Sequence, residues 1–133
     1  MPITKNPARQ ELIAAHVDIN LADVASNVAA PALDLPVGAV VVSGAFVTTE
    51  AWNSTTSDVM DVGDAGSATR YLKDGNIRAL GARVPLVPTG LVHDATNNTL
   101  RVTWTSGGGA PTTGKVRLEV QYFVKGRAAF TQG

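Results

Sequence analysis

The chain has 133 residues, the size of one domain, and contains no cysteine, which excludes disulfides, thiol catalysis and cysteine-based zinc sites. Eleven basic and eleven acidic residues cancel, which argues against a nucleic-acid-binding surface because neutralising phosphates requires an excess of positive charge. The 17 valines and 14 threonines favour strands, and the 13 glycines and 7 prolines favour turns. The composition therefore predicts an all-β domain.

The first residues predict an extended N-terminal arm over positions 1–10, because this segment carries two prolines together with Lys5 and Arg9. It has no apolar leader core, and no stretch of the chain approaches the roughly 18 apolar residues of a membrane span. We therefore expect a protein made in a cytoplasm, with no membrane partner.

In the first half, alternating apolar residues over 17–21 predict a half-buried strand. A weaker segment over 22–30 ends before Pro31, and a turn over LDLPVG leads into a long, mostly buried strand that runs from Val40 towards Trp52. Gly44 is expected to mark a bend or bulge in that strand. A short strand at 59–62 ends in the sequence GDAG.

In the second half, a loop is expected through Tyr71 to the turn dipeptide Asp74-Gly75. Pro85 and Pro88 predict that the short strand over 83–87 lies at a sheet edge, and residues 91–93 are expected to pair before a turn at 94–98. Strands follow at 100–105 and at 116–124, where the alternation is clearest, and residues 126–133 form a C-terminal tail.

Seven to eight short strands without a long helix predict an antiparallel sandwich of two sheets, either jelly-roll or immunoglobulin-like. The cysteine pair that marks immunoglobulin domains is absent. The predicted architecture is therefore a single-domain, jelly-roll-like β-sandwich over 1–133, with the N-terminal arm and the C-terminal tail at its ends.

The charges are unevenly distributed along the chain. Residues 10–69 carry eight acidic and no basic residues, whereas residues 70–133 carry nine basic and three acidic ones. Antiparallel folding would interleave the two halves and neutralise them internally. The alternative is a molecule with one acidic and one basic face, suited to self-association or docking.

Two motifs resemble ligand sites but lack essential parts. Residues 109–115 match the start of a phosphate-binding loop, yet Val116 stands where Ser or Thr should hold magnesium, and a strand is expected where that motif requires a helix. The acids Asp58, Asp61 and Asp64 lack the ligand spacing of a calcium loop and favour a tight turn, with a weak cation site between Asp61 and Asp64 as the alternative.

The two histidines each have an acidic residue nearby, Asp18 for His16 and Asp94 for His93, but no serine stands in a nucleophile-elbow pattern. Trp52 and Trp104 are interpreted as core anchors rather than as a sugar-binding platform. We therefore predict no catalytic residue, no metal ligand and no cofactor.

Four segments carry a resemblance to a family. They are ALDLPVGAVVVSGAFVTTEAWNSTTSDVMDVGDAG, VPLVPTG, NTLRVTWT and GKVRLEVQYFVKGRAAFTQ, and together they cover roughly residues 32–132. The recurring elements are Glu50-Ala-Trp52, Asp61-Val-Gly63-Asp64, Pro88-Thr-Gly90 and the terminal run from Arg127 to Gln132. The chain resembles head decoration (capsid cement) proteins of tailed bacteriophages.

This resemblance implies a β-sandwich without catalytic activity, made in the cytoplasm of a host bacterium. It would bind the outer surface of a capsid, cement neighbouring copies of the major capsid protein and form homodimers or homotrimers. Exposed basic residues and the two chain ends are the expected contacts: Lys5, Arg9, Arg70, Arg78, Arg127 and Phe130. The alternative function is a tail, fibre or host-adhesion sandwich that binds carbohydrate.

Overall fold

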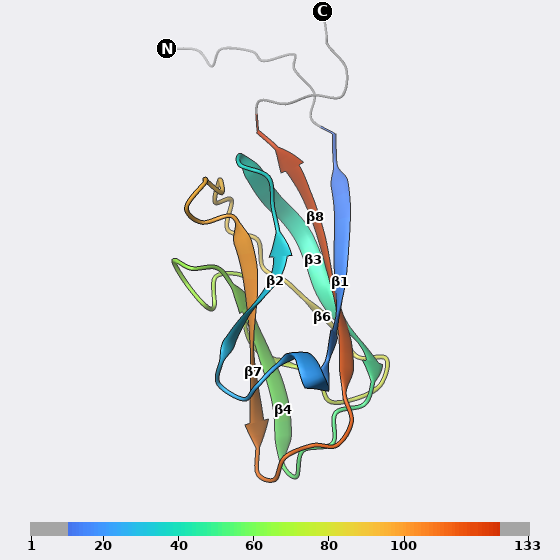
Figure 1. The fold of residues 1–133 in the computed structure, drawn as a ribbon. Helices are drawn as coiled ribbons and strands as arrows, with labels where there is room; N and C mark the ends of the chain where they lie inside the picture. The colour runs from blue at the N-terminus through green and yellow to red at the C-terminus, as the bar shows by residue number, and fades with distance from the viewer. Residues whose placement is uncertain (1–10, 126–133) are drawn as a thin grey trace, which may run out of the picture.

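The computed structural model describes residues 11–125, which fold into a β-sandwich of eight strands and one 3-10 turn (Figure 1). The elements in chain order are β1 (Ile13–Asn20), η1 (Leu21–Asp23), β2 (Ala29–Asp34), β3 (Ala39–Glu50), β4 (Ser57–Gly63), β5 (Leu72–Asn76), β6 (Arg83–Pro85), β7 (Thr99–Gly107) and β8 (Lys115–Val124). The predicted arm and tail lie outside the described residues. No helix among residues 11–125 has the length and hydropathy required to cross a bilayer.

The two four-stranded sheets have the strand orders β1-β8-β3-β6 and β2-β7-β4-β5. The antiparallel pairs β1–β8, β2–β7, β3–β6 and β4–β5 are nested, so the chain resembles one long hairpin wrapped into two layers. This arrangement is an eight-stranded jelly roll, which confirms the predicted fold class.

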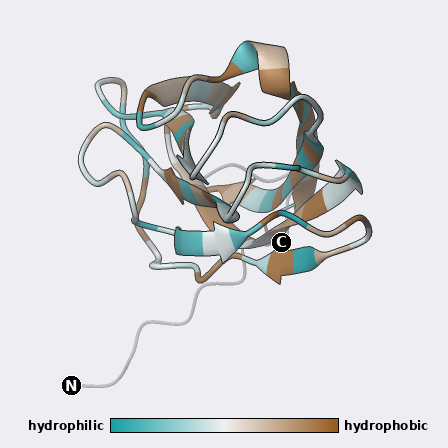
Figure 2. Ribbon diagram, turned by 90° about the horizontal axis from the view of Figure 1, so that it is seen from below, coloured by the Kyte–Doolittle hydropathy of each residue, from teal (hydrophilic) through white to brown (hydrophobic). Residues whose placement is uncertain are grey.

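The core lies between the sheets because apolar side chains alternate along the central strands. In β8, Val116, Leu118 and Val120 are at most 1% exposed, while the residues between them face outward. Phe46 of β3 lies opposite Leu118 and is fully buried. Figure 2 looks along the strands and shows hydrophobic and hydrophilic segments alternating within them.

The two tryptophans are core residues, as predicted. Trp52 and Trp104 are 1% and 5% exposed, and their ring centroids lie 5.4 Å apart. Gly114 is required beside them, because a Cβ there would lie 2.4 Å from the Trp52 ring. The close contact between Gly114 and the Trp52 ring thus holds the end of the β7–β8 loop against the core.

β1 begins at Ile13, four residues before the strand predicted at 17–21, and gives way to η1 at Leu21. Two further segments differ from the sequence prediction. β2 begins at Ala29 and continues through Pro31, where the prediction ends a weak strand before that proline. Proline is tolerated here because β2 is an edge strand, and the register with β7 shifts immediately after it.

The second difference is β5, which occupies part of the segment predicted to be a loop. Asp74-Gly75 forms an irregularity within this strand rather than a reversal, because the register against β4 shifts between Met60 and Val62. Asp74 adopts a φ of 54°, and its backbone N–H donates to Asp61 Oδ1 at 2.7 Å. A local turn signal is thus accommodated as a bulge.

The acidic and basic halves of the chain are interleaved by the fold. Asp18 of β1 lies opposite Arg117 of β8, and Glu50 of β3 lies opposite Lys115. The strand register thus places basic residues of the second half beside acidic residues of the first half, as the interpretation of internal neutralisation expects, although Arg117 forms its ion pair with Glu119 of the same strand.

Candidate interaction surfaces

Of the predicted contact residues, Lys5, Arg9, Arg127 and Phe130 lie outside the described residues, and Arg70 and Arg78 lie within them. Arg70 is held by the loop that follows β4. Its Nε donates to Asp64 Oδ2 at 2.5 Å, and the Asp64 side chain is fully buried. Asp64 Oδ1 also accepts hydrogen bonds from the backbone N–H groups of Gly66 and Ser67.

These bonds make Asp64 the organiser of a tight turn, as the sequence favours. Burial raises the pKa of the Asp64 carboxyl, but the hydrogen bonds, chiefly that from Arg70, outweigh burial and place the pKa below its ordinary value of 3.8. Residues 11–125 contain no group of three or more His, Cys, Asp or Glu side chains placed to hold a metal ion.

A lowered pKa at Asp64 makes stability depend on pH. The unfolded chain takes up this proton near pH 3.8, before the folded protein does, so the contribution is full above that pH and is lost as the pH falls through the folded pKa. We expect D64N and R70Q to reduce the acid-induced fall in the free energy of unfolding, measured by denaturant titration from pH 6 to pH 2. R101Q, which changes an exposed arginine, should keep the wild-type dependence.

Arg78 is half-buried beside Trp52 at the edge of a hollow of about 590 Å³ between β5 and β6. Its backbone carbonyl accepts from the Trp52 N–H at 3.0 Å. The buried nitrogens Arg78 Nη1 and Trp52 Nε1 have no acceptor among the described residues. Arg78 is therefore not the fully exposed basic residue that the sequence predicts. Its role as a capsid contact stays a prediction.

His93 is a buried residue of the fold. It is 1% exposed, its Nδ1 lies 2.8 Å from the carbonyl oxygen of Asn97, and its Nε2 lies 2.7 Å from the hydroxyl of Tyr71. A carbonyl oxygen only accepts, so Nδ1 carries the proton and Nε2 accepts from Tyr71. Burial raises the pKa of Tyr71 to about 12, which keeps the hydroxyl a donor. His16, by contrast, is exposed on β1.

Removing the Tyr71 hydroxyl leaves His93 Nε2 buried without a donor. We expect Y71F to lower the free energy of unfolding by about 1–3 kcal/mol. Denaturant unfolding at pH 7 measures this change. Y122F, at a tyrosine of β8 that is 8% exposed, is the matched control and should change stability less.

The glycine-rich segment 108–114 is the loop between β7 and β8, and β8 begins at Lys115. The segment after the loop is a strand, as predicted, and not the helix that a phosphate-binding loop requires.

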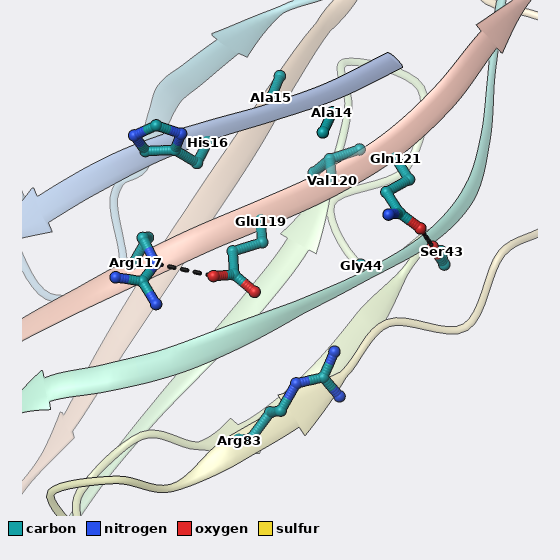
Figure 3. Close-up of a pocket in the computed structure, with 10 residues that line it drawn as sticks. All are labelled: Ala14, Ala15, His16, Ser43, Gly44, Arg83, Arg117, Glu119, Val120 and Gln121. Atoms are coloured by element: carbon teal, nitrogen blue, oxygen red, sulfur yellow. Dashed lines mark hydrogen bonds and ion pairs between the residues drawn. The ribbon is translucent and has the colours of Figure 1, made fainter. Parts of the chain in front are cut away.

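The outer face of the sheet β1-β8-β3-β6 contains a groove of about 470 Å³ (Figure 3). Arg117 Nε donates to Glu119 Oε2 at 2.8 Å, and Ser43 Oγ donates to Gln121 Oε1 at 2.6 Å. Arg83 reaches this face from β6, and His16 reaches it from β1. Gly44, which also lines the groove, has no room for a side chain, because a Cβ there would lie 2.5 Å from the backbone oxygen of Glu119 and 2.8 Å from the Leu86 side chain.

Exposed apolar residues gather at the end of the sandwich where residues 11 and 125 end the described fold. We define the apolar end patch as Leu12, Val37, Val42 and Val92, which are 39–57% exposed. Val92 pairs with Val40 at the start of β3, and the Lys125 N–H donates to the carbonyl of Gly38. β1 begins and β8 ends at this end of the sandwich (Figure 1). The patch could not be predicted from the sequence, because its members come from four separate segments.

Comparison with known structures finds chains that have a similar fold. A chain in the capsid asymmetric unit of cyanophage Pam1 matches 93% of this chain and 91% of its own length, with a TM-score of 0.71 and 24% identity. A chain in the capsid of Ralstonia phage GP4 matches 96% of this chain and 92% of its own length, with a TM-score of 0.68 and 17% identity. These likenesses show a shared fold over nearly the whole chain.

No protein-family model matches the sequence, and a search of curated proteins gives no significant match.

Proposed function

We propose that this protein is a structural component of a bacteriophage virion that binds the outer surface of the capsid and joins neighbouring major capsid protein subunits. The observation that carries the proposal is the match of its jelly roll, over more than nine-tenths of the chain, to chains from two phage capsids. The sequence resemblance to phage decoration proteins supports the same role. On this proposal the protein is made in the host cytoplasm and is not an enzyme.

The polar interior is consistent with a protein that acts through its surface. The buried acidic and histidine side chains of residues 11–125, Asp58, Asp64 and His93, all bond to groups of the same chain. The role of each of these side chains is therefore to stabilise the fold. We assign the function to the exposed surfaces instead.

We assign the capsid contact to the apolar end patch together with the N-terminal arm and the C-terminal tail. Lys5, Arg9, Arg127 and Phe130 belong to the arm and the tail, and Arg70 and Arg78 are the further proposed contacts. In such a contact the apolar patch would bury carbon surface, and the basic residues would place positive charge against the capsid. Many copies on one shell make even a weak individual contact effective.

The proposal is tested with phage particles that lack this protein, to which purified protein is added back. We expect the added protein to bind the particles and to raise the temperature at which they release DNA. Binding without any gain in that temperature would contradict the joining role, and an absence of binding would contradict the capsid role.

Paired aspartate variants test the contact surface. V37D and V92D place charges in the apolar end patch, whereas V28D places one on a valine that is 54% exposed in the loop between η1 and β2. The Asn27 N–H donates to the carbonyl of Trp104 in the second half of β7, whereas the Leu35 N–H, close to Val37 in the chain, donates to Asn98 just before β7 begins, so Val28 is remote from the patch. We expect the first two variants to bind particles more weakly and V28D to bind as the wild type does. Equal loss in all three would contradict the assignment.

A further inference from the structure

The four edges of the two sheets are protected unequally. β6 is three residues long and ends in Pro85, and β2 contains Pro31 followed by a register shift. β5 carries the irregularity at Asp74 and Gly75. Short length, proline and bulges are the devices that prevent an edge strand from pairing with another chain. Three of the four edges therefore carry such a device.

β1 is the exception. It pairs with β8 in an unbroken register over its eight residues, from Ile13 opposite Tyr122 to Asn20 opposite Lys115. Its sequence, IAAHVDIN, contains no proline, glycine or lysine. Within residues 11–125, β8 is the one strand that pairs with it. Among these residues its other edge has no strand partner, and the Asn20 N–H at its end donates to Asp23 Oδ2.

The core-facing side chains of β1 are incompletely covered. Ile13, Ala15 and Val17 pack against the core cluster but remain partly exposed, and Ile19 alone of this set is buried. A strand added to the β1 edge would place its own inward side chains beside them. Hydrogen bonding of the backbone and burial of these apolar side chains thus both favour the binding of a further strand at the β1 edge.

We propose that the β1 edge binds the β1 edge of a second copy of this chain, as an antiparallel pair about a twofold axis at Val17. In this register Val17 meets its own equivalent, and Ala15 lies opposite Ile19 on the inner face. On the outer face, His16 lies opposite Asp18 of the second copy, so an imidazole N–H faces a carboxylate twice in the dimer. The two four-stranded sheets become one eight-stranded sheet.

This register is selected by the side chains. In an antiparallel pair, two residues that lie opposite each other point to the same face of the sheet. The twofold axis must therefore pass between two copies of the same residue, because a shift of one residue would move each side chain to the other face. An axis at His16 would place the two imidazoles against each other and leave Asp18 opposite Ala14. The axis at Val17 pairs both polar residues, and the contact is self-complementary, as a twofold interface requires.

The oligomeric state of the purified full-length chain tests this proposal, independently of any capsid. We expect a concentration-dependent dimer by analytical ultracentrifugation, with backbone amides of β1 becoming more protected from hydrogen exchange as the dimer forms. H16E places two carboxylates opposite one another at both symmetric positions, and we expect it to weaken the dimer by about tenfold or more.

The double variant H16E/D18K restores opposite charges across the axis and should restore the dimer. R83E, on β6 at the far edge of the same sheet, is the matched control and should leave the dimer intact, with thermal unfolding confirming that each variant folds. A monomer at all concentrations, a dimer indifferent to H16E, no recovery in H16E/D18K, or protection gained in another strand would each overturn the proposal. None of these outcomes would affect the capsid test described above.

Discussion

Replacing Asp58 by alanine is expected to lower the free energy of unfolding by about 4 kcal/mol. Asp58 is 1% exposed and accepts three hydrogen bonds: from Ser54 Oγ at 2.5 Å, from the Ser54 N–H at 3.1 Å and from Trp104 Nε1 at 3.1 Å. Alanine leaves these donors buried without an acceptor, and each such donor costs about 1–3 kcal/mol.

Denaturant unfolding of D58A measures this loss, and D61A is its matched control. Asp61 lies on the same strand, is half-buried and accepts one hydrogen bond, from the Asp74 N–H. We expect D61A to cost about 1 kcal/mol. Equal effects of the two variants would show that the buried cluster around Asp58 does not hold β4 to the core.

The second large effect is expected at Gly63, the last residue of β4. A Cβ at this position would lie 2.1 Å from the backbone oxygen of Ser67 and 2.4 Å from the carbonyl carbon of Ala68. These are backbone atoms of the turn that Asp64 organises, so they cannot rotate away as a flexible side chain would. We expect G63A to lower the free energy of unfolding by about 3 kcal/mol, as overpacking at a rigid site does.

The control for G63A is G90A. Gly90 has a φ of +79° and no atom within 4 Å of an added Cβ, so alanine there meets only the backbone penalty of a left-handed conformation, about 1–2 kcal/mol. Denaturant unfolding compares the two variants directly. A smaller loss in G63A than in G90A would contradict the close approach between β4 and the turn.

The strands with clear alternation could be predicted from the sequence. β8, predicted at 116–124, is observed at Lys115–Val124, with alternate residues buried. β5 could not be predicted, because Asp74-Gly75 is a turn signal locally and only the ladder with β4 turns it into a bulge. The sequence thus identifies Asp74-Gly75 as a site of irregular backbone conformation. Only the pairing of β5 with β4 determines that this site is a bulge and not a chain reversal.

The sheet partners required information that periodicity does not contain. β1 pairs with β8 and β2 with β7, across most of the chain length, so the strand orders follow from long-range packing. The resemblance to decoration proteins indicated a sandwich, and the structure resolves its topology as a jelly roll.

The sequence predicted the candidate contact residues less completely than it predicted the strands. Arg70 is chemically suited to a contact, but Asp64 and its turn engage it within the chain. A signal for this was present in the sequence, since an Asp followed by Gly66 and Ser67 favours a side-chain-stabilised turn. The apolar end patch and the open β1 edge were not visible, because exposure and edge position exist only once the strands are assembled.

Cryo-electron microscopy of the native phage particle tests the central claim most directly. The account predicts many copies of this jelly roll on the outside of the capsid, each contacting more than one major capsid protein subunit, with the apolar end patch turned towards the shell. Density for the protein confined to a few copies in the tail or fibres, or its absence from the particle, would contradict the account.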